Sequence, residues 1–324
     1  MKSRIGVLFY PLLLAFEACF ALGAGAGTVA DFSFGMISGI ERGRIDEEVY
    51  ENGKCISRLV WPREAVPFVG FAAGVRVGNF ALSARVADSI PVKGGSIEDF
   101  DYLLPDSDVP SLYSRHDSYL DKDFRVRAKL GYAIGMGRRF WVTPAIGISY
   151  VDRKWTARDG YLQYPEISGV PWTGDEDRRS VKGAVLSYEQ SAMNCMVGLQ
   201  PTVELNESLK TGFSLFWYPF VRGDSLDSHF LRALEFYDAL REGNGYGLGG
   251  WILVKPFGPR GNAGLRLSCD YEYLTARGDT YSNVIGLSDD TFALTEGYSA
   301  RNAGYSWTFS FAVVFGENRA GFGL

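Results

Sequence analysis

The most constraining feature of this sequence is a strict alternation of apolar and polar residues in segments of about ten residues. From Phe124 to Ile134, every second residue is apolar, and the residues between them include Arg125, Arg127 and Lys129. A helix would mix these two sets on one face, whereas a strand sends successive side chains to opposite faces. The alternation therefore predicts β-strands. It recurs in three further segments, residues 209–221, 265–273 and 305–315.

Composition separates a membrane barrel from a soluble β-sandwich, which would also show alternation. The 324 residues include 39 Gly and 15% aromatic residues, yet the mean hydropathy is only −0.05. A transmembrane barrel shows lipid an apolar face and encloses a polar one, so the two cancel in any average. The formal net charge of −5 disfavours nucleic-acid binding, which normally requires a basic surplus.

Short and long connections alternate along the chain. Four short turns are expected near residues 78–79, 137–139, 206–207 and 258–262, and five long segments near 42–54, 97–121, 160–181, 224–243 and 279–300. They separate ten predicted strands: 30–42, 54–77, 80–96, 122–136, 140–159, 182–205, 208–223, 244–257, 263–278 and 301–315. An even strand count with this alternation is typical of an outer-membrane barrel. The sequence thus predicts an all-β, ten-stranded antiparallel transmembrane β-barrel with short periplasmic turns and long extracellular loops.

The N-terminus has the layout of a secretory signal peptide. Lys2 and Arg4 precede an apolar stretch, and small residues gather at 21–26. We predict a signal peptide over residues 1–26, with an approximate cleavage site, and a single barrel domain over residues 27–324. Export of the chain would place the barrel in the bacterial outer membrane and its long loops on the extracellular side.

Two polar clusters follow predicted strands at the long-loop end. Asp99 and Asp101 come after the third strand, and Asp227 and His229 after the seventh, so the clusters should face each other across the barrel mouth. A histidine acts as a base near neutral pH when a neighbouring group sets its tautomer and stabilises its charged form. Asp227 could do this for His229, while two carboxylates opposite could hold a water molecule. The alternative is a solvated acidic rim with an incidental histidine.

The mature chain contains a series of short motifs: Ala30–Gly35, Ile37–Gly39, Ser57–Trp61, Ser114–His116, Tyr150 with Thr156–Gly160, and Tyr188–Gln190. In this order and spacing, they resemble the motifs of the omptin family of ten-stranded outer-membrane endopeptidases over most of the mature chain. The resemblance implies that Asp227 and His229 activate water and that Asp99 and Asp101 position it for attack on a peptide bond. It implies an aspartic-type endopeptidase that needs no metal or other cofactor and acts on extracellular polypeptides.

Departures from the omptin pattern bear on substrate choice. Omptins cleave between basic residues, whose side chains pair with acidic groups in the groove. The acidic residue expected two positions before the catalytic Asp227 is Ser225 here, with Asp224 beside it, and another expected position reads Leu112. We expect Glu47 and Asp224 to contact substrate. Whether cleavage occurs near basic residues stays open.

The resemblance also implies a lipopolysaccharide requirement, met in omptins by residues on the outer barrel wall. Tyr150, Asp152 and Lys154 are retained here as candidate lipid-binding residues, but the expected phosphate-binding arginine is Ser191. In the alternative interpretation, Tyr150 belongs to the aromatic girdle and Lys154 reaches toward the membrane interface. Outer-membrane lipid is the expected partner in either case.

Two other functions compete with proteolysis. The barrel could be a catalytically silent omptin-like protein that acts as an adhesin or host-protein receptor. It could also be a general porin, although side chains can fill the lumen of a ten-stranded barrel.

Overall fold

The computed structural model describes residues 30–105, 107–256, 263–285 and 292–316; the predicted signal peptide lies outside these ranges. The described chain contains thirteen strand segments and no helix that is long and apolar enough to cross a membrane. The strands are β1 (Ala30–Glu51), β2 (Lys54–Val77), β3 (Phe80–Ser89), β4 (Val92–Asp101), β5 (Leu112–Tyr132), β6 (Ile134–Gly135), β7 (Phe140–Gln163), β8 (Arg179–Ser180), β9 (Ala184–Asn206), β10 (Leu209–His229), β11 (Leu234–Val254), β12 (Ala263–Val284) and β13 (Ala293–Gly316).

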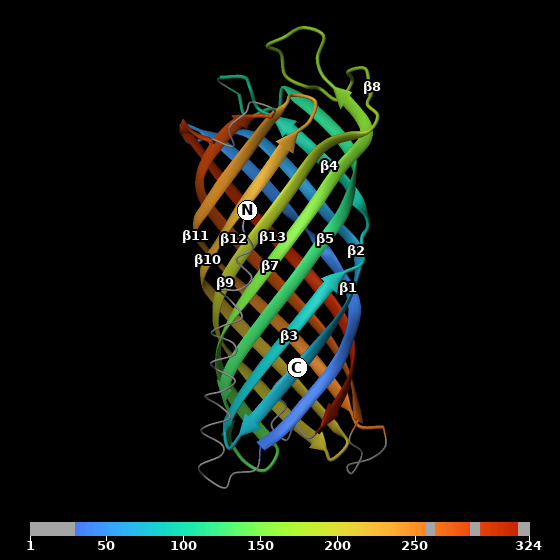
Figure 1. Ribbon diagram of the computed structural model, residues 1–324, viewed down its shortest axis with the longest axis vertical. Helices are drawn as coiled ribbons and strands as arrows, with labels where there is room; N and C mark the ends of the chain where they lie inside the picture. The colour runs from blue at the N-terminus through green and yellow to red at the C-terminus, as the bar shows by residue number, and fades with distance from the viewer. Residues whose placement is uncertain (1–29, 106, 257–262, 286–291, 317–324) are drawn as a thin grey trace.

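These segments form one closed antiparallel ring of ten barrel strands (Figure 1). Strand β1 pairs with β2 on one side and with β13 on the other, which closes the ring. Strands β3 and β4 together occupy a single place in the ring, because both pair with β2 and with β5. The short β8 pairs with β7 at the upper end in Figure 1. The predicted ten-stranded barrel is confirmed.

An apolar belt surrounds the half of the barrel that carries the short turns. Its side chains are large and exposed, as lipid-facing residues must be. The belt ends at Arg42 on β1 and at Arg222 on β10, which are both exposed. Examples within the belt are Phe34, Phe71, Ile146, Trp217 and Phe309.

The strands continue well beyond the apolar belt, and this corrects the predicted loops. Residues 42–51 still belong to β1, and residues 224–229 still belong to β10. Beyond the belt, the outer face is in water, and polar residues occupy both faces. The apolar–polar alternation therefore disappears although backbone pairing continues, so the sequence pattern placed the strand ends too early.

A cluster of buried aromatic residues fills the barrel above the belt. The rings of Trp61 and Tyr188 are stacked with centroids 5.5 Å apart, and Trp155 lies 6.1 Å from Trp61 and 5.8 Å from Tyr188. All three side chains are fully buried. Aromatic burial of this extent contributes strongly to stability, so the cluster supports strands that extend beyond the membrane.

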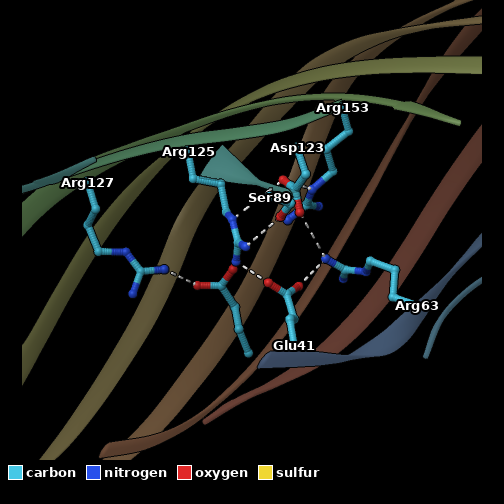
Figure 2. A network of polar contacts seen from close by, with 8 residues as sticks. Glu41, Arg63, Ser89, Asp123, Arg125, Arg127 and Arg153 are labelled. Carbon is cyan, nitrogen blue, oxygen red and sulfur yellow. Dashed lines mark hydrogen bonds and ion pairs between the residues drawn. The ribbon is translucent and has the colours of Figure 1, made fainter. Parts of the chain in front are cut away.

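Charged residues fill the lumen below this aromatic cluster (Figure 2). The Glu41 carboxylate accepts hydrogen bonds from Arg63 and Arg125, and Asp123 pairs with Arg153 at 2.9 Å. Lower down, Arg127 pairs with Glu272 at 2.6 Å. Arg127 thus pairs with β12, whereas Arg125 pairs with Glu41 on β1. In this network, buried carboxylates and arginines compensate each other's charge.

Glu41→Ala should strongly destabilise the barrel. It leaves two arginines without their shared carboxylate, and breaking a buried charge pair costs about 3–5 kcal/mol. Urea unfolding of the refolded protein in lipid vesicles measures the effect. Glu242→Ala is the matched control, since its pair with Arg277 is exposed (72% and 74% of the side chains) and should contribute less than about 1 kcal/mol. Equal destabilisation by both variants would contradict this role for Glu41.

Candidate active site

Strand register brings the two predicted polar clusters to the same end of the barrel. Asp99 lies opposite Leu59 on β2, which lies opposite Glu47 on β1, so these inward side chains form one row. Asp227 and His229 point inward from the last residues of β10, beyond the apolar belt. All four predicted catalytic residues are buried. They lie within strands β4 and β10 rather than after them, because both strands are longer than predicted.

Asp227 and His229 form a hydrogen-bonded pair. The Asp227 Oδ2 atom lies 2.5 Å from His229 Nε2, and the imidazole makes a T-shaped contact with the Phe236 ring. Burial by itself lowers the pKa of His229, but the Asp227 carboxylate outweighs it, so the pKa is raised above 6.5. This contact fixes the imidazole orientation and leaves Nδ1 as the ring nitrogen able to accept a proton.

Asp99 and Asp101 occupy different environments on β4. Asp101 accepts a hydrogen bond from Arg232 at 2.9 Å, whereas Asp99 accepts a longer one of 3.5 Å from the Ser114 hydroxyl. Burial, and then the nearby Asp101 charge, raise the pKa of Asp99 to about 7. Its Oδ1 atom, like Oδ1 of Asp227, is buried and accepts no hydrogen bond from the described protein groups. Each pair therefore retains a carboxylate oxygen that can accept a hydrogen bond from water or substrate.

His116 supports Asp99 from β5. It is buried; its Nδ1 atom contacts the Asp159 carbonyl at 2.5 Å, and its Nε2 atom contacts the Ser114 hydroxyl at 3.0 Å. Since Ser114 also contacts Asp99, His116 helps to hold Ser114 beside the acidic pair.

Glu47 and Asp238 form a buried acidic floor beside Asp227. Glu47 is 1% exposed and accepts a hydrogen bond from Trp61 at 3.2 Å. Burial, followed by repulsion from Asp227 and Asp238, raises the pKa of Glu47 well above its usual range. Sequence analysis named Glu47 as a candidate substrate contact but did not name Asp238, which faces Ser225 across the β10–β11 pairing.

Asp238 places a carboxylate beside Ser225, the position where the omptin pattern has an acidic residue. It accepts hydrogen bonds from the Ser225 hydroxyl at 2.9 Å and from Thr280 at 3.0 Å. Burial raises the pKa of Asp238 to about 7, against the lowering effect of these two hydrogen bonds. Counting alternate residues along β11 could have marked Asp238 as an inward-facing residue. The sequence does not show, however, which residues of β10 and β11 lie opposite each other.

The structure does not bring Asp224 to this site. Side chains alternate along β10, so Asp224 points outward while Ser225 and Asp227 point inward. Its carboxylate accepts hydrogen bonds from Tyr237 at 2.6 Å and pairs with Arg241 at 2.7 Å. The predicted substrate contact of Asp224 is therefore not supported by its position, and strand parity is the reason.

Tyr150, Asp152 and Lys154 share the outer face of β7, as alternation requires. Asp152 pairs with Lys122 at 2.6 Å, and Lys154 with Glu189 at 2.5 Å. Both lysines therefore already have acidic partners on neighbouring strands. Among the described residues, no group of three or more His, Cys, Asp or Glu side chains is arranged to hold a metal ion.

Asp227→Asn should lower the pKa of His229, because the variant removes the carboxylate that raises it. The chain has two histidines, so the two imidazole signals can be assigned and titrated by NMR on selectively labelled, refolded protein. His116 serves as the internal control and should titrate as in the wild type. An unchanged His229 titration would show that the Asp227 contact is not made in solution.

Asp238→Asn should stabilise the barrel at high pH. Because the folded-state pKa of about 7 exceeds the ordinary 3.8, the folded state binds this proton more tightly, and the charged group opposes folding increasingly as pH rises between these values. The variant should unfold at higher urea than wild type at about pH 8, and this gain should shrink toward about pH 4. A pH-independent difference would argue against the shifted pKa.

Comparison with known proteins identifies the family of this chain. The Omptin family model matches residues 28–307, whereas no curated protein is significantly similar in sequence. The outer membrane protease OmpT from Escherichia coli superposes with a TM-score of 0.76 at 16% identity, over 88% of this chain and 97% of OmpT. The NalP translocator domain from Neisseria meningitidis scores 0.35 at 9% identity over 96% of this chain and 97% of its own, too low to support any conclusion. The OmpT likeness supports the barrel fold, and the family match, which spans most of the sequence, shows that the chain belongs to the Omptin family.

Proposed function

We propose that this protein is an omptin-type outer-membrane endopeptidase that hydrolyses extracellular polypeptides with water activated by Asp227 and His229. Family membership and the OmpT-like fold support an outer-membrane protease of this type. The observation that carries the assignment is the 2.5 Å contact between Asp227 and His229, on a strand end that shares the barrel mouth with Asp99 and Asp101.

The proposed reaction is an aspartic-type hydrolysis without a covalent intermediate. Neutral His229 takes a proton from water at Nδ1, and Asp227 stabilises the resulting imidazolium. The water oxygen bonds to the peptide carbonyl carbon; the carbon–nitrogen bond then breaks, and the proton passes from His229 to the departing amine. Asp99 and Asp101 orient the water from the opposite strand. Orientation and proton transfer together are a recognised source of rate enhancement.

The acidic floor suggests the substrate preference. Glu47 and Asp238 are buried beside Asp227, and the ion pairs of the described residues include none to either carboxylate. A basic substrate side chain that reached this floor would supply the missing positive charge, so we propose cleavage next to Arg or Lys. Ser225 does not exclude this preference, because Asp238 supplies a carboxylate at the same level.

The outer wall suggests how the protein sits in its membrane. Tyr150, Asp152 and Lys154 lie on the lipid side of β7 near the upper limit of the apolar belt. We propose that they contact outer-membrane lipid headgroups, with lipopolysaccharide as the candidate activator, and that the catalytic end of the barrel faces the extracellular side.

Asp227→Ala and His229→Ala should each lower kcat for an Arg-containing fluorogenic peptide by about 100- to 10,000-fold, the usual contribution of a general base. The assay uses purified, refolded barrel with lipopolysaccharide, and Glu242→Ala is the control because this residue is exposed on the outer surface. Equal hydrolysis by wild type and both variants would refute the site assignment. Absence of cleavage by folded wild type across a broad peptide library would favour the adhesin or receptor function.

A further inference from the structure

Arg232 reaches across the barrel mouth from the turn that follows His229. The turn between β10 and β11 spans only residues 230–233. Two backbone hydrogen bonds anchor the turn: Phe230 N–H donates to the Val185 carbonyl at 3.0 Å, and Arg232 N–H donates to the His229 carbonyl at 3.2 Å. Ala233 adopts the left-handed conformation, with φ of 51°. A turn this short and this well anchored fixes where the arginine side chain begins.

The arginine ends on the opposite catalytic strand. Its Nη2 atom lies 2.9 Å from Oδ2 of Asp101, a residue 131 positions away in sequence. The Asp101 side chain is only 8% exposed, whereas that of Arg232 is 41% exposed. This ion pair therefore joins the turn after His229 to β4, the strand that carries Asp99 and Asp101. Sequence reasoning did not single out Arg232.

The charge balance of the mouth gives this ion pair its importance. Three buried carboxylates, those of Asp99, Asp101 and Asp227, meet there, and Arg232 contributes a permanent positive charge beside the titratable His229. Because the Asp101 carboxylate is buried, removing Arg232 would leave that charge without its counter-charge. Arg232 is therefore placed to influence both catalytic pairs at once.

We propose that Arg232 is a positioning residue that ties the His229 turn to Asp101 across the cleft and sets the electrostatic balance between the two catalytic pairs. For the reaction itself, this inference rests on the proposed endopeptidase function. The ion pair orients Asp101, and its fixed length holds the dyad and the acidic pair at the separation required for both to contact one water molecule. The guanidinium also disfavours protonation of the groups around it.

The titration of His229 reports on this balance without any need for turnover. Burial and Arg232 lower its pKa, while Asp227 and Asp99 raise it. Removing the guanidinium should therefore raise the pKa of His229. The charged and titratable groups around His229 and Arg232 are Asp227 on β10, Asp99 and Asp101 on β4, and Tyr164 after β7.

NMR titration of the two histidines in refolded Arg232→Gln tests the inference directly. We expect the pKa of His229 to rise and that of His116 to stay unchanged. Arg232→Lys retains the charge and should stay near the wild-type value. Arg241→Gln is the matched control, because Arg241 pairs with Asp224 on the outer face of the same hairpin and should leave His229 unaffected. A wild-type His229 titration in Arg232→Gln would overturn the proposal.

Peptide cleavage provides the second readout. Arg232→Gln should lower kcat about 10- to 100-fold, the cost of a small misplacement of reacting groups. It should also move the acid limb of the kcat profile to higher pH, because neutral His229 is the base. A purely structural role would lower the urea midpoint and leave the pH profile of the folded fraction unchanged, which would also overturn the proposal.

The two proposals can fail separately. If Asp227→Ala abolishes cleavage while Arg232→Gln matches wild type in kcat and pH profile, Arg232 is not a positioning residue although the endopeptidase function stands. If folded wild type cleaves nothing, the endopeptidase function fails, and the histidine titration still decides whether Arg232 controls the charge balance of the mouth.

Discussion

The pairing of β1 with β13 is the interaction on which the rest of the structure depends. In lipid, each unpaired backbone N–H or C=O costs several kcal/mol, so a sheet can span a membrane only when it has no free edge. The register from Ser33↔Gly316 to Glu51↔Tyr298 closes this ring along β1 from its fourth residue to its last. Closure also fixes which residues face inward, because the alternation of inward and outward side chains on each strand must match that of the strands paired with it.

The same paired strands pass through two environments and meet different requirements in each. Within the belt, apolar side chains face lipid, and the lumen holds balanced charges such as those around Glu41 and Asp123. Beyond the belt, the outer face becomes polar, and the lumen is filled by the Trp61, Trp155 and Tyr188 cluster. This aromatic filling lets the strands extend into water and gives the acidic residues above it a rigid, desolvated support.

Desolvation connects the fold to its proposed chemistry. Asp99, Asp238 and Glu47 are pushed toward protonation by burial, whereas His229 is pushed toward its charged form by Asp227. All four pKa values are raised, which favours neutral carboxyl groups beside a charged imidazole, and perturbed pKa values in groups that share a cleft are characteristic of functional sites. Arg232 adds a permanent charge to the same cleft, and with it the balance depends on a turn that is not itself part of the dyad.

The sequence by itself determined the barrel and the choice of catalytic candidates. Period-two alternation within the belt is a direct record of a lipid face and a lumenal face, and the motifs identified Asp99, Asp101, Asp227 and His229. Alternation says nothing where both faces are polar, so strand ends beyond the belt were placed too early. Asp224 was expected to contact substrate because it lies next to Ser225, where the omptin pattern has an acidic residue, although adjacent residues in a strand point in opposite directions.

Only the tertiary structure decided which distant residues meet. The positions of Asp238 beside Ser225 and of Arg232 on Asp101 depend on strand register and on a turn conformation, neither of which is encoded in any local pattern. The register of each strand depends on all the backbone pairings around the closed ring, so it cannot be read from the sequence of any single strand. That is the physical reason why the identities of the catalytic candidates could be read from the chain, whereas their partners could not.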